Sequence, residues 1–308
     1  MGVIMDIEQL LAQRARLVDG EMPNLLMDIK PPELAAAVSY AILSKGKRIR
    51  PALVTLASEA VGGTAEKACF AAASIELIHS SSLVLDDVID KSEKRRGRST
   101  VHTLWGNDMA LLTVQILAAL SLRIAARDPR LIHAIADSLF YMGEGEAMEL
   151  VEFAKDKKSY LDLAFRKTGS LFSSAAEVGA LVGGGDRTQI KKLKEFGNHI
   201  GLAFQIRDDI LDCISKEDDL GKPVKKDLFM GRPSIVLLDA INSGISIERM
   251  MKCNNGELMH LVSESIENAK NVAIEEIDIA KCQIENFDDS YAKTKLNEMG
   301  DYIITRSK

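Results

Sequence analysis

Two short aspartate clusters share one spacing. The first, DDVID, runs from Asp86 to Asp90, and the second, DDILD, runs from Asp208 to Asp212. On a helix, residues four apart lie one turn apart on the same face, so each cluster is expected to aim its carboxylates in one direction. Like charges this close repel, and a bound cation relieves the repulsion most simply.

Hard carboxylate oxygens that leave room for water and phosphate suit Mg²⁺ better than zinc. The alternative interpretation is a solvated acidic helix face, and a single DDxxD match is weak evidence against it. Two matches carry more weight. Each also follows an apolar run, Leu83 to Leu85 in the first case and Leu202 to Phe204 in the second. We therefore predict two magnesium-binding clusters at the inner ends of buried helices.

Basic residues accompany the first cluster. Arg95 and Arg96 follow it within a few residues, and an earlier GKRIRP segment places Lys47 and Arg50 three apart. Taken alone, such runs are more typical of solvated faces. Next to a metal cluster they suit a polyanion, which guanidinium groups bind from one side and the metal from the other.

The segments that must position these residues are predicted to be helices. Only seven prolines interrupt the chain, which is rich in Ala, Leu, Ile, Glu and Lys. Apolar residues recur three and four apart, as at Leu34, Val38 and Ala41, while alternating strand patterns are nearly absent. No low-complexity linker separates two halves, so we predict one all-α domain over residues 1–308, with roughly ten or more helices.

Composition indicates a soluble globular protein. Of 308 residues, 46% are apolar and 27% are charged, and the formal charge of -6 gives no reason to expect nucleic-acid binding. The N-terminus lacks the pattern of a signal peptide, and the longest nearly apolar run, Met109 to Leu122, is too short to span a bilayer. We therefore expect a cytoplasmic protein without a transmembrane segment.

Six motifs in chain order resemble those of the trans-isoprenyl diphosphate synthase family. They are GKRIRP (Gly46 to Pro51), the His79 helix ending in DDVID, RRG (Arg95 to Gly97), KTGSLF (Lys167 to Phe172), FQIRDDILD (Phe204 to Asp212) and LGKP (Leu220 to Pro223). The likeness runs from about Lys45 to about Arg232, with a similar tail from Asp301 to Arg306.

The resemblance implies a reaction and a fold. Members of that family join an allylic diphosphate to isopentenyl diphosphate by ionisation, condensation and elimination, which yields longer all-trans prenyl diphosphates. The implied fold is a large antiparallel helical bundle around a central cavity. The two aspartate clusters would face each other across that cavity, and the protein would be a homodimer.

The resemblance also implies residue roles. Two to three Mg²⁺ ions on the allylic diphosphate would be held by Asp86, Asp87, Asp90, Asp208 and Asp212. The same diphosphate would be contacted by Arg95, Lys167 and Lys222, with Thr168 and Gln205 lining it and Arg232 nearby. Isopentenyl diphosphate would be held by Lys47, Arg50, His79 and Arg96. The departing diphosphate would be the base that removes the proton. For His79, a satisfied core histidine is the alternative.

The chain departs from the family pattern at three places. Val114-Gln115 stands where a Gly-Asp pair is usual, Lys225 replaces a glycine after LGKP, and Arg232 replaces a lysine. The last exchange keeps the charge and changes the geometry.

Product length in this family depends on bulk upstream of the first aspartate. Ser81 and Ser82 are small where short-product enzymes carry bulky aromatics, and Ile78 lies about one turn deeper. This predicts a geranylgeranyl product, with longer polyprenyl and then farnesyl products as alternatives. A terpene cyclase or a non-catalytic subunit is disfavoured, because both aspartate clusters and the RRG motif are intact.

Overall fold

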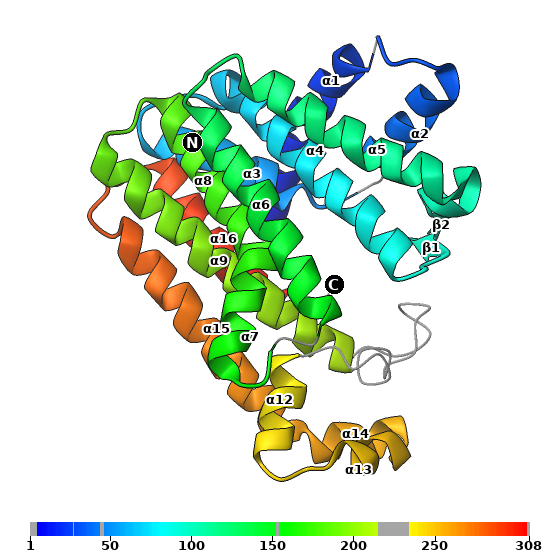
Figure 1. Cartoon of the computed structure of the whole chain (residues 1–308). Coiled ribbons are helices and arrows are strands. Elements are labelled where there is room, and N and C mark those ends of the chain that lie inside the picture. The colour runs from blue at the N-terminus through cyan, green and yellow to red at the C-terminus, as the bar shows by residue number, and fades with distance from the viewer. Residues whose placement is uncertain (1–4, 27, 44–45, 152–153, 215–233, 307–308) are drawn as a thin grey trace. The chain divides into compact units, whose positions relative to one another are not determined.

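The computed structural model describes residues 5–26, 28–43, 46–151, 154–214 and 234–306 (Figure 1). Over these residues the chain is helical apart from one two-stranded ribbon, which confirms the all-α prediction. The chain divides into two compact units. Unit 1 comprises Met1–Leu139, Ser174–Lys194 and Phe287–Leu296, and unit 2 comprises Phe140–Ser173, Glu195–Asn286 and Asn297–Lys308.

Unit 1 is built around one long buried helix. Its elements are α1 (Ile7–Leu25), α2 (Pro32–Ile42), α3 (Ile49–Ala60), α4 (Ala65–Ile89), β1 (Lys94–Arg95), β2 (Arg98–Ser99) and α5 (Val101–Ala125). Helix α4 packs against α1, α2, α3 and α5. Thr64 caps its start, where the hydroxyl accepts a hydrogen bond from the Lys67 amide at 3.3 Å. Because it has helical neighbours on several sides, α4 is apolar nearly all round until its last turn.

A tight hairpin follows α4. Lys94 pairs with Ser99 and Arg95 with Arg98, so the turn consists of Arg96 and Gly97. Both turn residues have positive φ, 51° and 76°, as a two-residue type I′ turn requires. Gly97 adopts this conformation without strain, which explains the glycine of the RRG motif. The turn separates Arg95, on a strand, from Arg96, at the tip.

Unit 2 has its own apolar core, which includes Tyr160, Ile206, Ile210 and Ala269. The elements that carry its residues, several of them shared with unit 1, are α6 (Leu131–Leu150), α7 (Lys157–Ala164), a π-helical turn (Phe165–Gly169), α8 (Ser170–Gly183), α9 (Arg187–Ile214), α12 (Ile235–Asn242), α13 (Ile247–Lys252), α14 (Asn255–Leu261), α15 (Ser263–Ile284) and α16 (Tyr291–Thr305). The π-helical turn contains Lys167 and Thr168, and such turns recur at functional sites.

Two helices are long and apolar enough to cross a membrane by length and composition alone. They are α4 and α5, and the apolar windows of these helices are 72% and 39% buried inside the structure. The core helices of soluble proteins pass the same test, and the burial of α4 is of that kind. The apolar run from Met109 to Leu122 is part of helix α5, which extends beyond the run at both ends.

Candidate active site

The first aspartate cluster lies at the C-terminal end of α4. Asp86 and Asp87 are in its last turn, and Asp90 is the capping residue, whose amide donates to the Asp86 carbonyl at 2.8 Å. The C-terminal end of a helix carries partial negative charge, so carboxylates placed there need a cation more than they would elsewhere. Asp86 and Asp90 are half-buried. These two carboxylates are one turn apart, as the spacing predicts.

Asp87 differs from its neighbours. Its side chain is buried, and Arg95 Nε donates to its Oδ1 at 2.8 Å. The expectation that all three carboxylates point in one direction is therefore refined, because Asp87 turns toward the hairpin. This ion pair fixes the first arginine of the RRG motif next to the cluster. Arg95 lies eight residues after Asp87, and the turn after α4, where the Ser92 amide donates to the Asp87 carbonyl at 2.9 Å, brings the two side chains together.

A group of basic residues lies near His79 of α4. Arg50 Nη1 is 3.5 Å from His79 Nε2, and a side chain on Gly46 would lie 2.6 Å from Arg96 Nη1. The structure thus brings residues of the GKRIRP and RRG motifs close to one another and to His79, and their binding of isopentenyl diphosphate stays a prediction. Lys47 lies exposed just before α3.

The charge state of His79 follows from this surrounding. Burial lowers the pKa of its imidazole well below the ordinary value of 6.5, and several nearby arginines, Arg50 foremost, lower it further. At neutral pH the ring is therefore uncharged. A neutral imidazole donates one hydrogen bond and accepts another, which a phosphate or an arginine can use.

The residue that anchors this basic group was not predicted from the sequence. Arg48, between Lys47 and Ile49, is buried with φ of 50°, and it pairs with Glu76 of α4 and with Asp19 of α1 at 3.0 Å. Burial raises the pKa of Glu76, while Arg48 and then two further arginines oppose that shift. An isolated acid within the apolar stretch of α4, three residues before His79, was the available signal.

The second cluster lies at the end of α9 in unit 2. Asp209 is buried and accepts three hydrogen bonds, from Tyr160 Oη at 2.8 Å, Gln205 Nε2 at 2.9 Å and the Ile235 amide at 3.1 Å. Its role is to join three elements. Burial and this carboxylate raise the pKa of Tyr160 well above its ordinary value. Asp208 and Asp212 are more exposed and remain the candidate ligands.

Asp208 has a partner from the tail of the chain. Arg306 Nη2 donates to Asp208 Oδ1 at 2.5 Å and to the Phe204 carbonyl at 3.2 Å, and its guanidinium lies 3.8 Å from the Phe204 ring centroid. Arg207 Nη2 in turn donates to the Arg306 carbonyl at 2.8 Å. The C-terminal segment that resembles the family, Asp301 to Arg306, thus contacts the second aspartate cluster through Arg306. No role for Arg306 was predicted.

The predicted residues of the KTG motif lie in the same unit. Thr168 Oγ1 donates to Gln205 Oε1 at 2.6 Å, which continues the chain of hydrogen bonds to Asp209. Lys167 Nζ lies 2.5 Å from Glu149 and 3.1 Å from Glu146, two residues of α6 that the sequence analysis did not select. Three acids in the run from Glu144 to Glu149 were the available signal.

Glycines allow α6 and α9 to approach the π-helical turn. A side chain at Gly145 would lie 2.5 Å from the Lys167 amide nitrogen, and one at Gly201 would lie 2.6 Å from the Gly169 Cα. Any larger residue at either position would displace the backbone that carries Lys167.

The residues proposed to set product length lie on two sides of α4. Ser81 is buried and donates to the Val114 carbonyl of α5 at 3.1 Å, and Ile78 is fully buried. Ser82 is half-buried and donates to the His79 carbonyl at 3.0 Å. At the Gly-Asp departure, Val114 supplies this carbonyl and Gln115 is exposed. Lys222, Lys225 and Arg232 lie outside the described residues.

The donor set fits magnesium shared with a ligand. Among the residues that the structure describes, no three acidic, His or Cys side chains form a metal site by themselves. A pair of carboxylates one turn apart, such as Asp86 and Asp90, supplies only part of an octahedral shell. Mg²⁺ commonly takes its other ligands from water and phosphate oxygens.

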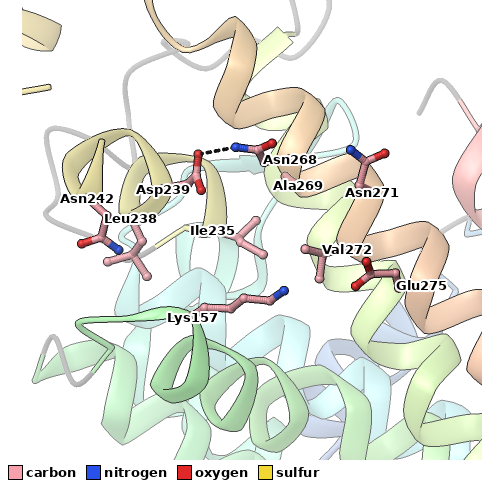
Figure 2. Close-up of a pocket in the computed structure, with 10 residues that line it drawn as sticks. All are labelled: Lys157, Ile235, Leu238, Asp239, Asn242, Asn268, Ala269, Asn271, Val272 and Glu275. Carbon is pink, nitrogen blue, oxygen red and sulfur yellow. Dashed lines mark hydrogen bonds between the residues drawn. The ribbon is translucent and has the colours of Figure 1, made fainter. Parts of the chain in front are cut away.

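A hollow of about 270 Å³ lies elsewhere in unit 2, between α7, α12 and α15 (Figure 2). Asn268 Nδ2 donates to Asp239 Oδ2 at 3.1 Å on its wall, and Lys157 extends into it. Of the predicted site residues that the structure describes, none lines it.

Comparison with known proteins agrees with the motifs. Residues 31–277 match the polyprenyl synthetase family model. A short chain isoprenyl diphosphate synthase of Methanothermobacter thermautotrophicus is 34% identical, over 98% of this chain and 99% of the relative. The crystal structure of geranylgeranyl pyrophosphate synthetase from Pyrococcus horikoshii superposes with a TM-score of 0.89 at 32% identity, covering 97% of this chain and 99% of that one.

A further solved structure is a polyprenyl synthase from Caulobacter crescentus, complexed with calcium and isoprenyl diphosphate. Its TM-score is 0.85 at 26% identity, over 97% of this chain and 98% of that one. The chain therefore belongs to the polyprenyl synthetase family. It has the all-α isoprenoid synthase fold and is a prenyltransferase, as the motifs predicted.

Proposed function

We propose that the chain is a geranylgeranyl diphosphate synthase that condenses isopentenyl diphosphate with an allylic diphosphate. One observation carries most of this proposal. Within unit 1, the end of α4 places two half-buried carboxylates, Asp86 and Asp90, next to a group of arginines around a neutral His79. Carboxylates that bind a metal, together with arginines that bind phosphate oxygens, suit a diphosphate that is bound partly through the metal.

The allylic diphosphate is proposed to bind through two to three Mg²⁺ ions. The residues assigned to the metal are Asp86, Asp87, Asp90, Asp208 and Asp212. The Caulobacter crescentus relative, solved with calcium and isoprenyl diphosphate, supports a divalent cation. Bound magnesium would neutralise the diphosphate and improve it as a leaving group. Asp87 also holds Arg95 in place through the 2.8 Å ion pair.

Cationic and polar side chains complete the allylic site in this proposal. Arg95 and Lys167 bind phosphate oxygens, with Lys222 and Arg232 from the LGKP segment and its sequel. Thr168 and Gln205 line the same group, and their 2.6 Å hydrogen bond orients both. Such donors stabilise the negative charge that develops on the leaving diphosphate.

Isopentenyl diphosphate is assigned to the basic group of unit 1. Lys47, Arg50 and Arg96 supply positive charge, and neutral His79 supplies a hydrogen bond. The buried Arg48 and Glu76 pair holds the backbone of this segment. The double bond of isopentenyl diphosphate then attacks the allylic cation, and the released diphosphate is proposed to take the proton.

Small residues support the assigned product. Ser81 and Ser82 on α4 leave space where an aromatic would end chain growth early, with Ile78 about a turn deeper. The Pyrococcus horikoshii relative is named a geranylgeranyl pyrophosphate synthetase. Longer polyprenyl products are the first alternative, and a farnesyl product is the second.

The remaining features of the proposal are one polyprenyl synthase domain over residues 1–308, a homodimer, and a cytoplasmic protein without a membrane span or a nucleic-acid partner. Exposed leucines on α5, namely Leu104, Leu111 and Leu112, support a second copy as the cover of that face. The net charge of -6 supports the absence of nucleic acid.

One assay tests the central claim. The purified protein is incubated with Mg²⁺, labelled isopentenyl diphosphate and, in separate reactions, dimethylallyl, geranyl or farnesyl diphosphate, and product lengths are resolved. We expect a twenty-carbon product from accepted primers. Failure to elongate any of the three primers would overturn the proposal, and a different length would revise the product.

A further inference from the structure

A cavity of about 360 Å³ opens beside the first aspartate cluster. It lies between α2, α4, the β1–β2 hairpin and the start of α5, all within unit 1. Asp87 lines it, whereas Asp86, Asp90 and His79 do not. The cavity therefore adjoins the proposed diphosphate sites and shares Asp87, Arg95 and Arg96 with them, whereas Arg98 and the apolar lining residues belong to neither site. Its volume is within the range of small-molecule pockets.

Apolar side chains form much of its wall. Leu43 stands at the mouth with 61% of its surface exposed, and Val84 and Val101 are 4% exposed at the base. Ala41 and Leu83 complete this side. A ligand that enters therefore buries hydrocarbon against these side chains, which favours binding of an aliphatic chain.

Arginines also line the cavity. Arg95, Arg96 and Arg98 line the cavity, and the acid among its residues, Asp87, is already paired with Arg95. The Arg98 guanidinium lies 4.1 Å from the centroid of the Tyr40 ring, and its Nη1 donates a long hydrogen bond of 3.4 Å to the Leu43 carbonyl. Within the described part of the chain, Arg98 takes part in none of the ion pairs. This cation therefore lacks a neutralising carboxylate there.

The Tyr40 ring under Arg98 is held in place by two contacts. Tyr40 Oη donates to the Ser99 carbonyl at 2.7 Å, and the Tyr40 ring meets Trp105 edge-on, with centroids 5.3 Å apart. The guanidinium is thus positioned before any ligand arrives, which lowers the entropic cost of binding an anion.

We propose that this cavity binds a soluble amphipathic anion, a single aliphatic chain that carries a phosphate monoester. The chain lies along Leu43, Leu83 and Val84, and the phosphate meets Arg98 and Arg96. Because Arg95 lines the same cavity, the bound phosphate competes with Asp87 for it. Occupancy thereby weakens the allylic site. This last consequence rests on the proposed function, whereas the binding itself does not.

Binding is measured by calorimetry with decyl phosphate below its micelle concentration, in EDTA and without substrates, so that failure of catalysis does not affect the result. We expect one equivalent to bind. Arg98→Gln should weaken binding roughly tenfold, since a charge-assisted hydrogen bond is lost. Leu43→Asp, which places a carboxylate at the mouth, should weaken it at least as much. Arg123→Gln, an exposed change on α5 outside the cavity, is the matched control.

Two further arms identify the ligand. Inorganic phosphate alone should bind far more weakly than decyl phosphate, because it lacks the chain. Vesicles containing phosphatidic acid should not be retained in an Arg98-dependent way. Equal affinity of decyl phosphate for wild type, Arg98→Gln and Leu43→Asp would overturn the proposal. So would loss of binding in Lys167→Ala, which would place the ligand in the allylic site, or Arg98-dependent vesicle binding, which would indicate a membrane surface.

Where prenyltransferase activity is present, decyl phosphate should raise the KM for the allylic diphosphate. In Arg98→Gln that effect should be smaller by a similar factor, while activity without decyl phosphate stays unchanged. An identical rise in KM for both proteins would contradict the coupling through Arg95 and leave the direct binding result as a separate test of the cavity.

Discussion

Lys167 Nζ lies 2.5 Å from Glu149 Oε2, and Glu146 is 3.1 Å from the same nitrogen. The three side chains are largely buried, and the carboxylates outnumber the ammonium. Before a diphosphate can bind the Lys167 ammonium, the ammonium must give up its contact with at least one of these glutamates. The two glutamates therefore oppose a ligand of the same sign, and they hold the lysine in one place until it arrives.

Glu149→Gln should lower the KM for the allylic diphosphate several-fold, because it removes one competing negative charge. The change corresponds to about 1 kcal/mol for a partly buried ion pair. Steady-state kinetics with varied allylic substrate measure it. Glu144→Gln is the matched control, since Glu144 on the same helix pairs with Arg166. An unchanged or higher KM in Glu149→Gln would contradict the competition.

The second aspartate cluster should contain one residue that is needed for folding, Asp209, and one that is needed for activity, Asp212. Asp209→Asn loses acceptor capacity for Tyr160, Gln205 and the Ile235 amide, so we expect a loss of about 1–3 kcal/mol of stability and a lower Tm. Asp212→Asn should leave the Tm nearly unchanged, because Asp212 is exposed, and should instead lower activity. Thermal unfolding followed by circular dichroism distinguishes them, and equal Tm losses would refute the division.

Loss of Asp86 from the first cluster should weaken magnesium binding. Asp86→Ala should lower kcat by orders of magnitude and raise the Mg²⁺ concentration needed for half-maximal rate. The physical reason is the loss of a hard oxygen ligand at a helix end that already favours a cation. EDTA should abolish wild-type activity, and Mg²⁺ should restore it. Asp288→Ala, at an exposed site, is the control. Near-normal rates in Asp86→Ala would remove its metal role.

Stability should fall at acid pH partly through His79. Its folded-state pKa is lowered by burial and by Arg50, so the unfolded chain binds the proton more tightly. The unfolded state is then favoured as the pH falls below about 6.5, by up to about 1.4 kcal/mol per pH unit. His79→Gln should show a smaller loss of Tm between pH 7.5 and 5.5 than wild type, and His133→Gln, which is exposed on α6, should not. Parallel curves for all three proteins would contradict the assignment.

The helices and the order of the motifs follow from the sequence because they are local. Three- and four-residue periodicity places Asp86 and Asp90 on one face without knowledge of any other segment. The partner that turns Asp87 aside, Arg95, lies on the first strand of a hairpin, and Arg96 and Gly97, the residues of the hairpin turn, were noted only for their charge and motif. Their positive φ angles become visible in the structure.

Long-range ion pairs are harder to predict. Charge spacing on one helix says nothing about Glu149, which meets Lys167 eighteen residues later, or about Arg306, which reaches Asp208 from the far end of the chain. Burial decides which carboxylates need protein partners, and burial depends on packing. Hence all three aspartates of the first cluster, with Asp208 and Asp212 of the second, were predicted as metal ligands, while the folding role of Asp209 was not predicted.

Product length should respond to bulk on one face of α4. Ser81 is buried against the Val114 carbonyl, so Ser81→Phe must place a ring between α4 and α5 in the predicted path of the growing chain. We expect products shorter than those of wild type, resolved by chromatography after labelled elongation.

Ser80→Phe is the control for this prediction. It makes the same change on a buried residue of the same helix that lines the neighbouring cavity instead, so the product length of this variant should not change. A Tm measurement accompanies both variants to show that they fold. Unchanged product length in a folded Ser81→Phe protein would show that the hydrocarbon takes another path, and shortening in Ser80→Phe as well would show that the effect is not specific to that face.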